Sequence, residues 1–239
     1  MLTDDPAPAE HVIAVSRSAC GTVVLDGVPL SPEPDLAAAV LIAAIDRILL
    51  GATTCLTIHA AAMAGPRSAA IVPGVSGTGK STLAAAAMQR GLRLVSDEAA
   101  CLDPHLNVLW PHPRPLGLDQ SSRTLLGLPA PTQGPVDGER ATAPALLGPT
   151  VPTDQTVPVT LIVLPFRRPG CAAPGLTEIS RADGLAALLG NCLNIGATAA
   201  WTPQQAWARL GALIAATQVL RMDYDTPQQG SVLLTQALT

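Results

Sequence analysis

The chain has 239 residues, of which 48% are hydrophobic, 13% are charged and only 2% are aromatic. This length accommodates one α/β domain with a small extension, and the core must be built from Ala, Leu, Val and Ile. The net charge of −4 and the scattered basic residues are unfavourable for a nucleic-acid partner, which requires clustered positive charge.

The spacing of the cysteines and the character of the N-terminal residues indicate the cellular compartment of the protein. Five widely spaced cysteines, an odd number without a CxxC pair, are typical of free thiols in a reducing cytosol rather than of a disulfide framework or a zinc site. The acidic residues 1–5 lack the basic region of a signal peptide. The longest apolar run, residues 36–45, is too short to cross a bilayer. We therefore expect a cytoplasmic protein with no membrane partner.

The N-terminal residues predict a small β/α extension over residues 1–53 that packs on the core. Residues 11–30 alternate weakly and contain a turn at Asp26-Gly27, which predicts two or three short strands. Asp35 is a suitable N-cap for a helix over residues 36–50, which ends before Gly51.

The core domain is expected over residues 54–239. Residues 54–60 predict a strand, and residues 69–72 predict a second strand that runs directly into a glycine-rich loop. An Ala-rich helix follows over residues 81–90, which Gly91 terminates, and residues 92–95 predict a short buried strand.

The rest of the chain alternates between irregular and regular segments. Residues 104–117 and 127–158 are rich in Pro and Gly, and we assign no regular structure to most of them. A stretch as long as 127–158 with so little periodicity is typical of a mobile functional loop or of a disordered segment. A strand at 157–164, helices at 181–194 and 203–217 and a strand at 219–224 complete the domain.

The glycine-rich loop matches the nucleotide-binding pattern GxxxxGK[ST]. Backbone N–H groups can wrap a phosphate closely only where Cβ atoms are absent, and the following helix adds its positive N-terminal end. Lys80, the only lysine in the chain, is expected to neutralise the β- and γ-phosphate oxygens during binding and catalysis, and the Ser81 hydroxyl to contact Mg²⁺. The alternative is a chance glycine-rich turn. The residues expected to bind ATP are Gly74, Ser76, Gly77, Thr78, Gly79, Lys80, Ser81 and Thr82.

Two carboxylates, Asp97 and Glu98, follow the strand after the loop helix. A strand–loop–helix–strand unit in a parallel sheet brings both loop ends to one edge, so these groups would face the phosphates. Phosphoryl transfer requires such a base or metal-holding carboxylate, but Ser-Asp-Glu is equally suited to a solvated turn. His59 ends the strand before the loop strand and can reach the same edge, where a lone histidine is more often structural.

Three stretches taken together, residues 57–60, 74–83 and 90–98, resemble the HPr kinase/phosphorylase family. Residues 110–116 are similar to a segment of its short relatives, the HPr-kinase-like proteins found with ribosomally made peptides and especially with lasso peptides. The resemblance covers residues 54–120 well and the C-terminal third loosely. Its specificity comes from the upstream histidine and the acidic pair, since many NTPases share the loop.

This resemblance implies an α/β fold, a P-loop kinase core like the C-terminal domain of HPr kinase and like phosphoenolpyruvate carboxykinase. It also implies transfer of phosphate from ATP to a serine hydroxyl. Asp97 matches the carboxylate that accepts the hydroxyl proton, and His59 matches the active-site histidine. Glu98 matches the neighbour near Mg²⁺, where full-length enzymes usually have a second Asp, so the division of roles is open. Arg114 is a candidate for binding phosphate or substrate, and Arg168 a weaker one, because an arginine at a strand end is usually only solvated.

The chain also departs from the family. It lacks a convincing counterpart of the N-terminal domain and the glycine-rich signature associated with phosphorylase activity, so neither HPr dephosphorylation nor the accompanying hexamer is implied, and a homo-oligomer is left open. The expected partner is a peptide or protein carrying a serine, in particular a lasso-type precursor. A small-metabolite kinase and a non-catalytic nucleotide switch are the alternatives.

Overall fold

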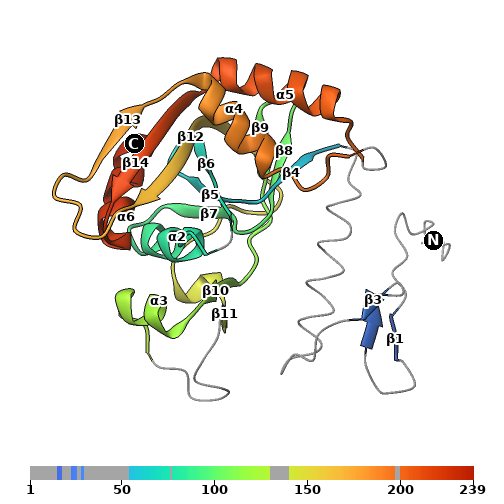
Figure 1. Ribbon diagram of the computed structural model, residues 1–239. Coiled ribbons are helices and arrows are strands. Elements are labelled where there is room, and N and C mark those ends of the chain that lie inside the picture. Colours follow the sequence, from blue (N-terminus) through green and yellow to red (C-terminus); the bar gives the residue numbers. More distant parts are fainter. Residues whose placement is uncertain are drawn as a thin grey trace, which may run out of the picture. The chain divides into compact units, whose positions relative to one another are not determined.

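The computed structural model describes residues 54–75, 77–129, 140–196 and 200–239, together with the backbone of three short strands nearer the N-terminus. The chain divides into two compact units, Met1–Gly51 and Ala52–Thr239 (Figure 1).

The described part of the first unit is an antiparallel sheet in the order β1-β2-β3. The strands are β1 (Val15–Arg17), β2 (Val23–Leu25) and β3 (Val28–Pro29). They fall within residues 11–30, where the sequence predicts short strands. The helix predicted over residues 36–50 lies outside the described residues.

The second unit is mixed α/β and is built on a nine-stranded sheet. Seven strands form the path β4-β8-β9-β12-β6-β5-β7, while β14 pairs with β12 and β13 pairs with β14. The strands are β4 (Leu56–Ile58), β5 (Ala60–Ala64), β6 (Ala69–Pro73), β7 (Arg93–Ser96), β8 (Ala100–Asp103), β9 (Val108–Trp110), β12 (Val157–Arg167), β13 (Gly175–Glu178) and β14 (Gln218–Tyr224).

Strand direction brings four carboxyl ends to one edge of this sheet. Strands β6 and β14 both run parallel to β12. Strand β5 lies between β6 and β7 and is antiparallel to both, so β7 runs in the direction of β6. The C-terminal ends of β6, β7, β12 and β14 therefore share an edge with the N-terminal end of β5.

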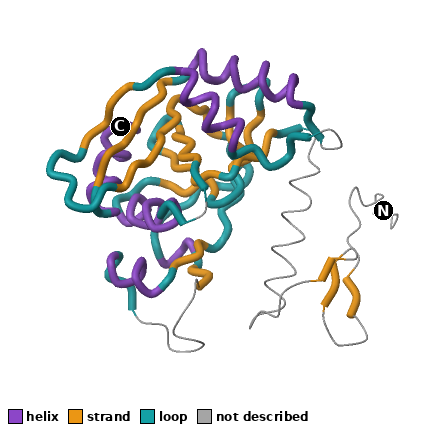
Figure 2. Tube along the Cα trace, viewed as in Figure 1, coloured by secondary structure: helices purple, strands orange, loops and turns teal. Residues whose placement is uncertain are grey.

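Helices cover both faces of the sheet, as Figures 1 and 2 show. Helices α2 (Lys80–Gln89) and α6 (Pro227–Leu238) pack on one face, and α4 (Arg181–Gly190) and α5 (Pro203–Ala216) on the other. The buried side of α2 is mostly alanine, which lets its backbone approach the sheet closely. No described helix is long and apolar enough to cross a membrane.

Local signals in the sequence start the longer helices. Thr202 and Gln205 form a reciprocal capping box at the N-terminus of α5, and Thr226 and Gln229 form another at α6. Each helix begins with a proline, which has no N–H to leave unsatisfied. These ends agree closely with the sequence prediction for the helix over residues 203–217.

The prediction that most of the two Pro/Gly-rich segments lacks regular structure is confirmed for their described residues, although the segments also contain short elements that were not predicted. The segments contain β9, most of β10 (Leu116–Leu118), β11 (Arg140–Thr142) and the 3₁₀ helix η1 (Pro144–Leu146), and α3 (Gln120–Leu125) lies between them. The short strands pair with distant partners, β10 with β11 and β9 with β8 and β12, so local periodicity is absent. Within the expected mobile loop 127–158, residues 130–139 lie outside the description.

Two predicted boundaries also change. The strand expected over residues 54–60 is interrupted at His59, whose N–H donates to the Asn191 carbonyl at 2.7 Å. The helix expected over residues 181–194 ends at Gly190, because the chain turns there to pair with β4: the Leu193 N–H donates to the Thr57 carbonyl at 2.8 Å.

Candidate active site at the carboxyl edge of the sheet

The glycine-rich loop joins the end of β6 to the start of α2. Gly77 and Gly79 have φ values of 81° and 85°, in the left-handed region that favours glycine. Gly79 is also the N-cap of α2, and no side chain caps the helix there. The first N–H groups of α2 are therefore suited to an anion. Ser76, one of the expected phosphate-binding residues, lies outside the described residues.

The side chains of the loop converge on one carbonyl. The Val75 oxygen accepts hydrogen bonds from Lys80 Nζ at 3.1 Å and from Thr78 Oγ1 at 2.8 Å. Lys80 is only 3% exposed, although a lysine is costly to bury. A buried ammonium beside a helix N-terminus that no side chain caps concentrates positive charge at this loop.

Asp97 is the most unusual acid in the described part of the chain. It follows β7 directly, is 0% exposed, and neither of its carboxylate oxygens has a hydrogen-bond partner there. Burial raises its pKa from an ordinary 3.8 to about 6. The Ser81 hydroxyl is near enough to lower the pKa in part, although it makes no well-formed hydrogen bond to either oxygen.

Neighbouring charges also act on Asp97. The negative charge of Glu98 raises its pKa, while the positive charges of Lys80 and Arg114 lower it. The fold thus brings the loop lysine, the loop serine, both acids and Arg114 to one place.

Glu98 and His59 form a second pair at this edge. Glu98 Oε2 lies 2.9 Å from His59 Nε2, an ion-pair distance if the imidazole is protonated, although the two groups are not aligned as a hydrogen bond. Glu98 has a φ of 72°, which is uncommon for a residue with a side chain. The sequence predicted that His59 reaches this edge, and it does so at the start of the antiparallel strand β5.

Arg114 reaches the site along the outer edge of β7. The His112 N–H donates to the Val95 carbonyl at 2.8 Å, and Ser96 pairs with His112 in a parallel bridge. The segment around His112 thus extends the sheet and places Arg114 within electrostatic range of Asp97.

Arg168 is not part of this cluster. Its Nε lies 2.9 Å from Asp223 Oδ1, beyond the end of β12, and it is not among the charges that act on Asp97. Thr82, another expected ATP-binding residue, bonds through its hydroxyl to Ser122 in α3 at 2.7 Å. Ser122 was not predicted from the sequence, although Asp119, which caps α3 by accepting from the Ser122 N–H, is a recognisable helix-start signal.

The arrangement has the charges for holding a phosphate group and a divalent cation. No group of three or more His, Cys, Asp or Glu residues in the described ranges could hold a metal by itself. The Ser81 hydroxyl and the unpartnered carboxylate of Asp97 offer oxygen ligands that suit Mg²⁺, which commonly completes its shell with phosphate oxygens and water. The residues present therefore fit Mg²⁺ bound together with a phosphate-bearing ligand.

Comparisons with known proteins do not assign the chain to a family. No model of a protein family matches the chain, and no curated protein matches it. Among solved structures, the Hpr(Ser) kinase/phosphatase from Coxiella burnetii aligns with 76% of this chain and 95% of its own, at 14% sequence identity and a TM-score of 0.35. Similarity at this level establishes neither a shared fold nor a shared activity, so we infer neither from it. The expected likeness to the HPr kinase core and to phosphoenolpyruvate carboxykinase stays a prediction.

Proposed function

We propose that the protein is an ATP-dependent kinase that transfers the γ-phosphate to a serine hydroxyl of a peptide or protein in the cytoplasm. The observation that supports this most strongly is Asp97, a buried carboxylate without a hydrogen-bond partner among the described residues, beside the only lysine and the hydroxyl of Ser81. Burying an unpartnered carboxylate costs free energy, and active sites retain such groups for their chemistry.

ATP is proposed to bind with its phosphates in the glycine-rich loop. Phosphate oxygens would take over the Lys80 and Thr78 donors that now bond to the Val75 carbonyl. Ser81 and Glu98 would hold Mg²⁺, whose charge would stabilise the negative charge that develops on the phosphates.

Transfer then requires one proton acceptor. The serine oxygen attacks the γ-phosphorus, its proton passes to the Asp97 carboxylate, and the bond to the β–γ bridging oxygen breaks to release ADP. With a pKa of about 6, Asp97 is mostly ionised at pH 7 and is still a stronger base than an ordinary aspartate. His59, which lies beside Glu98, is proposed to orient the acceptor, and Arg114 to bind the transferred phosphate.

The sequence motifs support a ribosomally made, lasso-type precursor peptide as the acceptor. The test is the intact mass of a serine-containing precursor peptide encoded beside this gene, after incubation with the protein, ATP and Mg²⁺. A gain of one phosphate that Lys80→Ala and Asp97→Asn both abolish is the expected result. No gain while ATP still binds would favour a small-metabolite kinase or a non-catalytic switch instead.

A further inference from the structure

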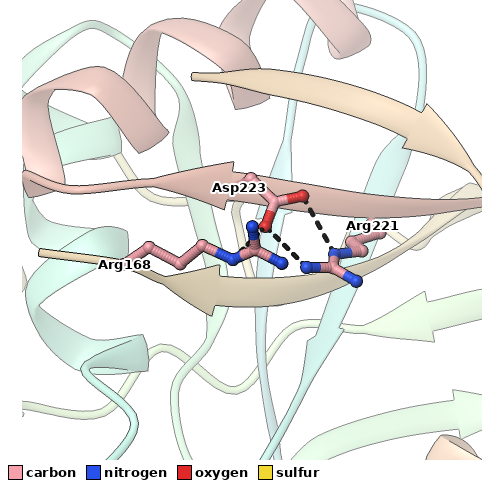
Figure 3. A network of polar contacts seen from close by, with 3 residues as sticks. All are labelled: Arg168, Arg221 and Asp223. Atoms are coloured by element: carbon pink, nitrogen blue, oxygen red, sulfur yellow. Dashed lines mark hydrogen bonds and ion pairs between the residues drawn. The ribbon is translucent and has the colours of Figure 1, made fainter. Parts of the chain in front are cut away.

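Two arginines share one carboxylate at the ends of β12 and β14. Asp223 accepts from Arg221 through both oxygens, at 2.9 Å from Nε and 2.8 Å from Nη2, and Arg168 Nε lies 2.9 Å from Asp223 Oδ1. Figure 3 shows both guanidinium groups converging on Asp223. The hydrogen bonds from Arg221 lower the pKa of Asp223, so it is charged at neutral pH and the trio has a net charge of about +1.

The two arginines are held to different degrees. Arg221 is fixed by the bidentate contact and by the ring of Phe166, whose centroid lies 4.3 Å from the guanidinium carbon. Arg168 is bound only through Nε, and its terminal nitrogens have no hydrogen-bond partner in the described residues. Its side chain is 59% exposed, and Phe166 beside it is 44% exposed. The network therefore presents unused donors next to an exposed aromatic ring.

The network lies at the same edge of the sheet as the glycine-rich loop. In the parallel register Ile162 of β12 is opposite Ile71 of β6, and β6 ends two residues later at Pro73. Arg168 is six residues beyond Ile162, so it extends about four residues, or about 13 Å, past the end of β6. Asp97, the proposed base, follows β7, which lies three strands from β12 in the order β12-β6-β5-β7, or about 14 Å across the sheet. The two offsets combine to about 19 Å, which an extended peptide spans with about six residues.

We infer that Arg168, with Arg221 and Phe166, binds an acidic side chain of the peptide acceptor about five to seven residues from the phosphorylated serine. This inference rests on the proposed function and adds a sequence preference to it. A carboxylate of the peptide would bond to the terminal nitrogens of Arg168, a charge-assisted and potentially bidentate contact. The chain has a net charge of −4, so a local positive site at this edge would attract an acidic segment of the peptide there.

The experiment measures binding and transfer separately on the full chain. The probes are two fluorescein-labelled peptides of alanine and glycine with a central serine. One has glutamates five to seven residues to each side of the serine, and the other has glutamines at the same positions. Binding is followed by fluorescence anisotropy in the presence of ADP and Mg²⁺ at low ionic strength. Transfer to the unlabelled peptides is followed by mass with ATP.

The glutamate peptide is expected to bind about fivefold more tightly, a preference that shrinks as salt screens the charges. Arg168→Gln should remove the preference and Arg168→Lys should restore part of it. Arg209→Gln, which changes an exposed arginine of α5, should leave it intact. Equal binding of the two peptides, or a preference that survives Arg168→Gln, would overturn the inference. Preserved preference without transfer would support the acidic site but contradict the kinase function, so the two failures are distinguishable.

Discussion

The burial of Asp97 should be visible in the stability of the protein. Because its pKa is raised to about 6 from an ordinary 3.8, the native state keeps this proton in a pH range where the unfolded state has lost it. The free energy of unfolding should therefore fall as pH rises from about 4 to about 6 on account of this group. Asp97→Asn should be more stable than wild type by about 3 kcal/mol at pH 7, and close to unchanged at pH 4.

Urea denaturation at the two pH values measures this effect. Asp154→Asn, which changes an exposed aspartate, is the control and should alter stability by less than about 0.5 kcal/mol. If Asp97→Asn were less stable than wild type at pH 7, the ionised Asp97 would have partners that stabilise it.

The same carboxylate sets the expected pH dependence of the reaction. A base must be ionised to accept the serine proton, so kcat/KM should decrease as pH falls through about 6, roughly tenfold for each further pH unit. Steady-state rates between pH 5 and 8 measure the profile. A rate that is flat down to pH 5 would contradict the assignment of Asp97 as the base.

Helix packing against the sheet gives a prediction at the scale of the elements. Gly184 of α4 lies against β14, where an added Cβ would come within 2.7 Å of Val219 Cγ1 and 3.0 Å of Ile214 Cδ1. Gly184→Ala should therefore destabilise the protein by about 1–3 kcal/mol. Gly211 of α5 has no atom within 4 Å of the same position. Gly211→Ala should stabilise it by about 0.5–1 kcal/mol, since alanine is the better helix former.

Chemical denaturation of these two variants compares them directly. Equal changes in the free energy of unfolding would mean that α4 can move away from β14, and that its close approach is not required by the fold.

How far the sequence predicts the elements depends on whether their signals are local. The loop strand β6, helix α2 and strand β7 have continuous apolar or Ala-rich runs, and the prediction placed them within one or two residues. Strands β9, β10 and β11 are three residues each and are stabilised by partners distant in the chain, so a Pro- and Gly-rich sequence conceals them. The antiparallel insertion of β5 between β6 and β7 is likewise a property of the whole sheet.

The candidate site follows the same rule. Lys80, Ser81 and Asp97 could be found because a compact motif or a strand end marks them. The approach of Arg114 depends on the pairing of His112 with Ser96, which no local pattern encodes. The Arg221–Asp223 pair could have been noticed from its spacing, since two residues apart on a strand lie on one face.

At the scale of the whole molecule, a ligand that binds only the native state must stabilise all of it. If ATP with Mg²⁺ binds the glycine-rich loop, the melting temperature should rise with nucleotide concentration, corresponding to about 2.7 kcal/mol at a concentration one hundred times the Kd. Lys80→Ala should lose most of this shift, and Arg90→Ala, at the far end of α2, should keep it. Differential scanning calorimetry with and without nucleotide measures the shift.

The most direct test of the kinase proposal separates nucleotide binding from transfer in the same variants. Calorimetric titration with ATP and Mg²⁺, run beside phosphate incorporation into a serine peptide, should show that Asp97→Asn binds ATP within about threefold of wild type but transfers at least about a hundredfold more slowly. Lys80→Ala should lose both. Near wild-type transfer by Asp97→Asn would contradict the assignment of Asp97 as the base, and wild-type ATP binding by Lys80→Ala would contradict the phosphate site itself.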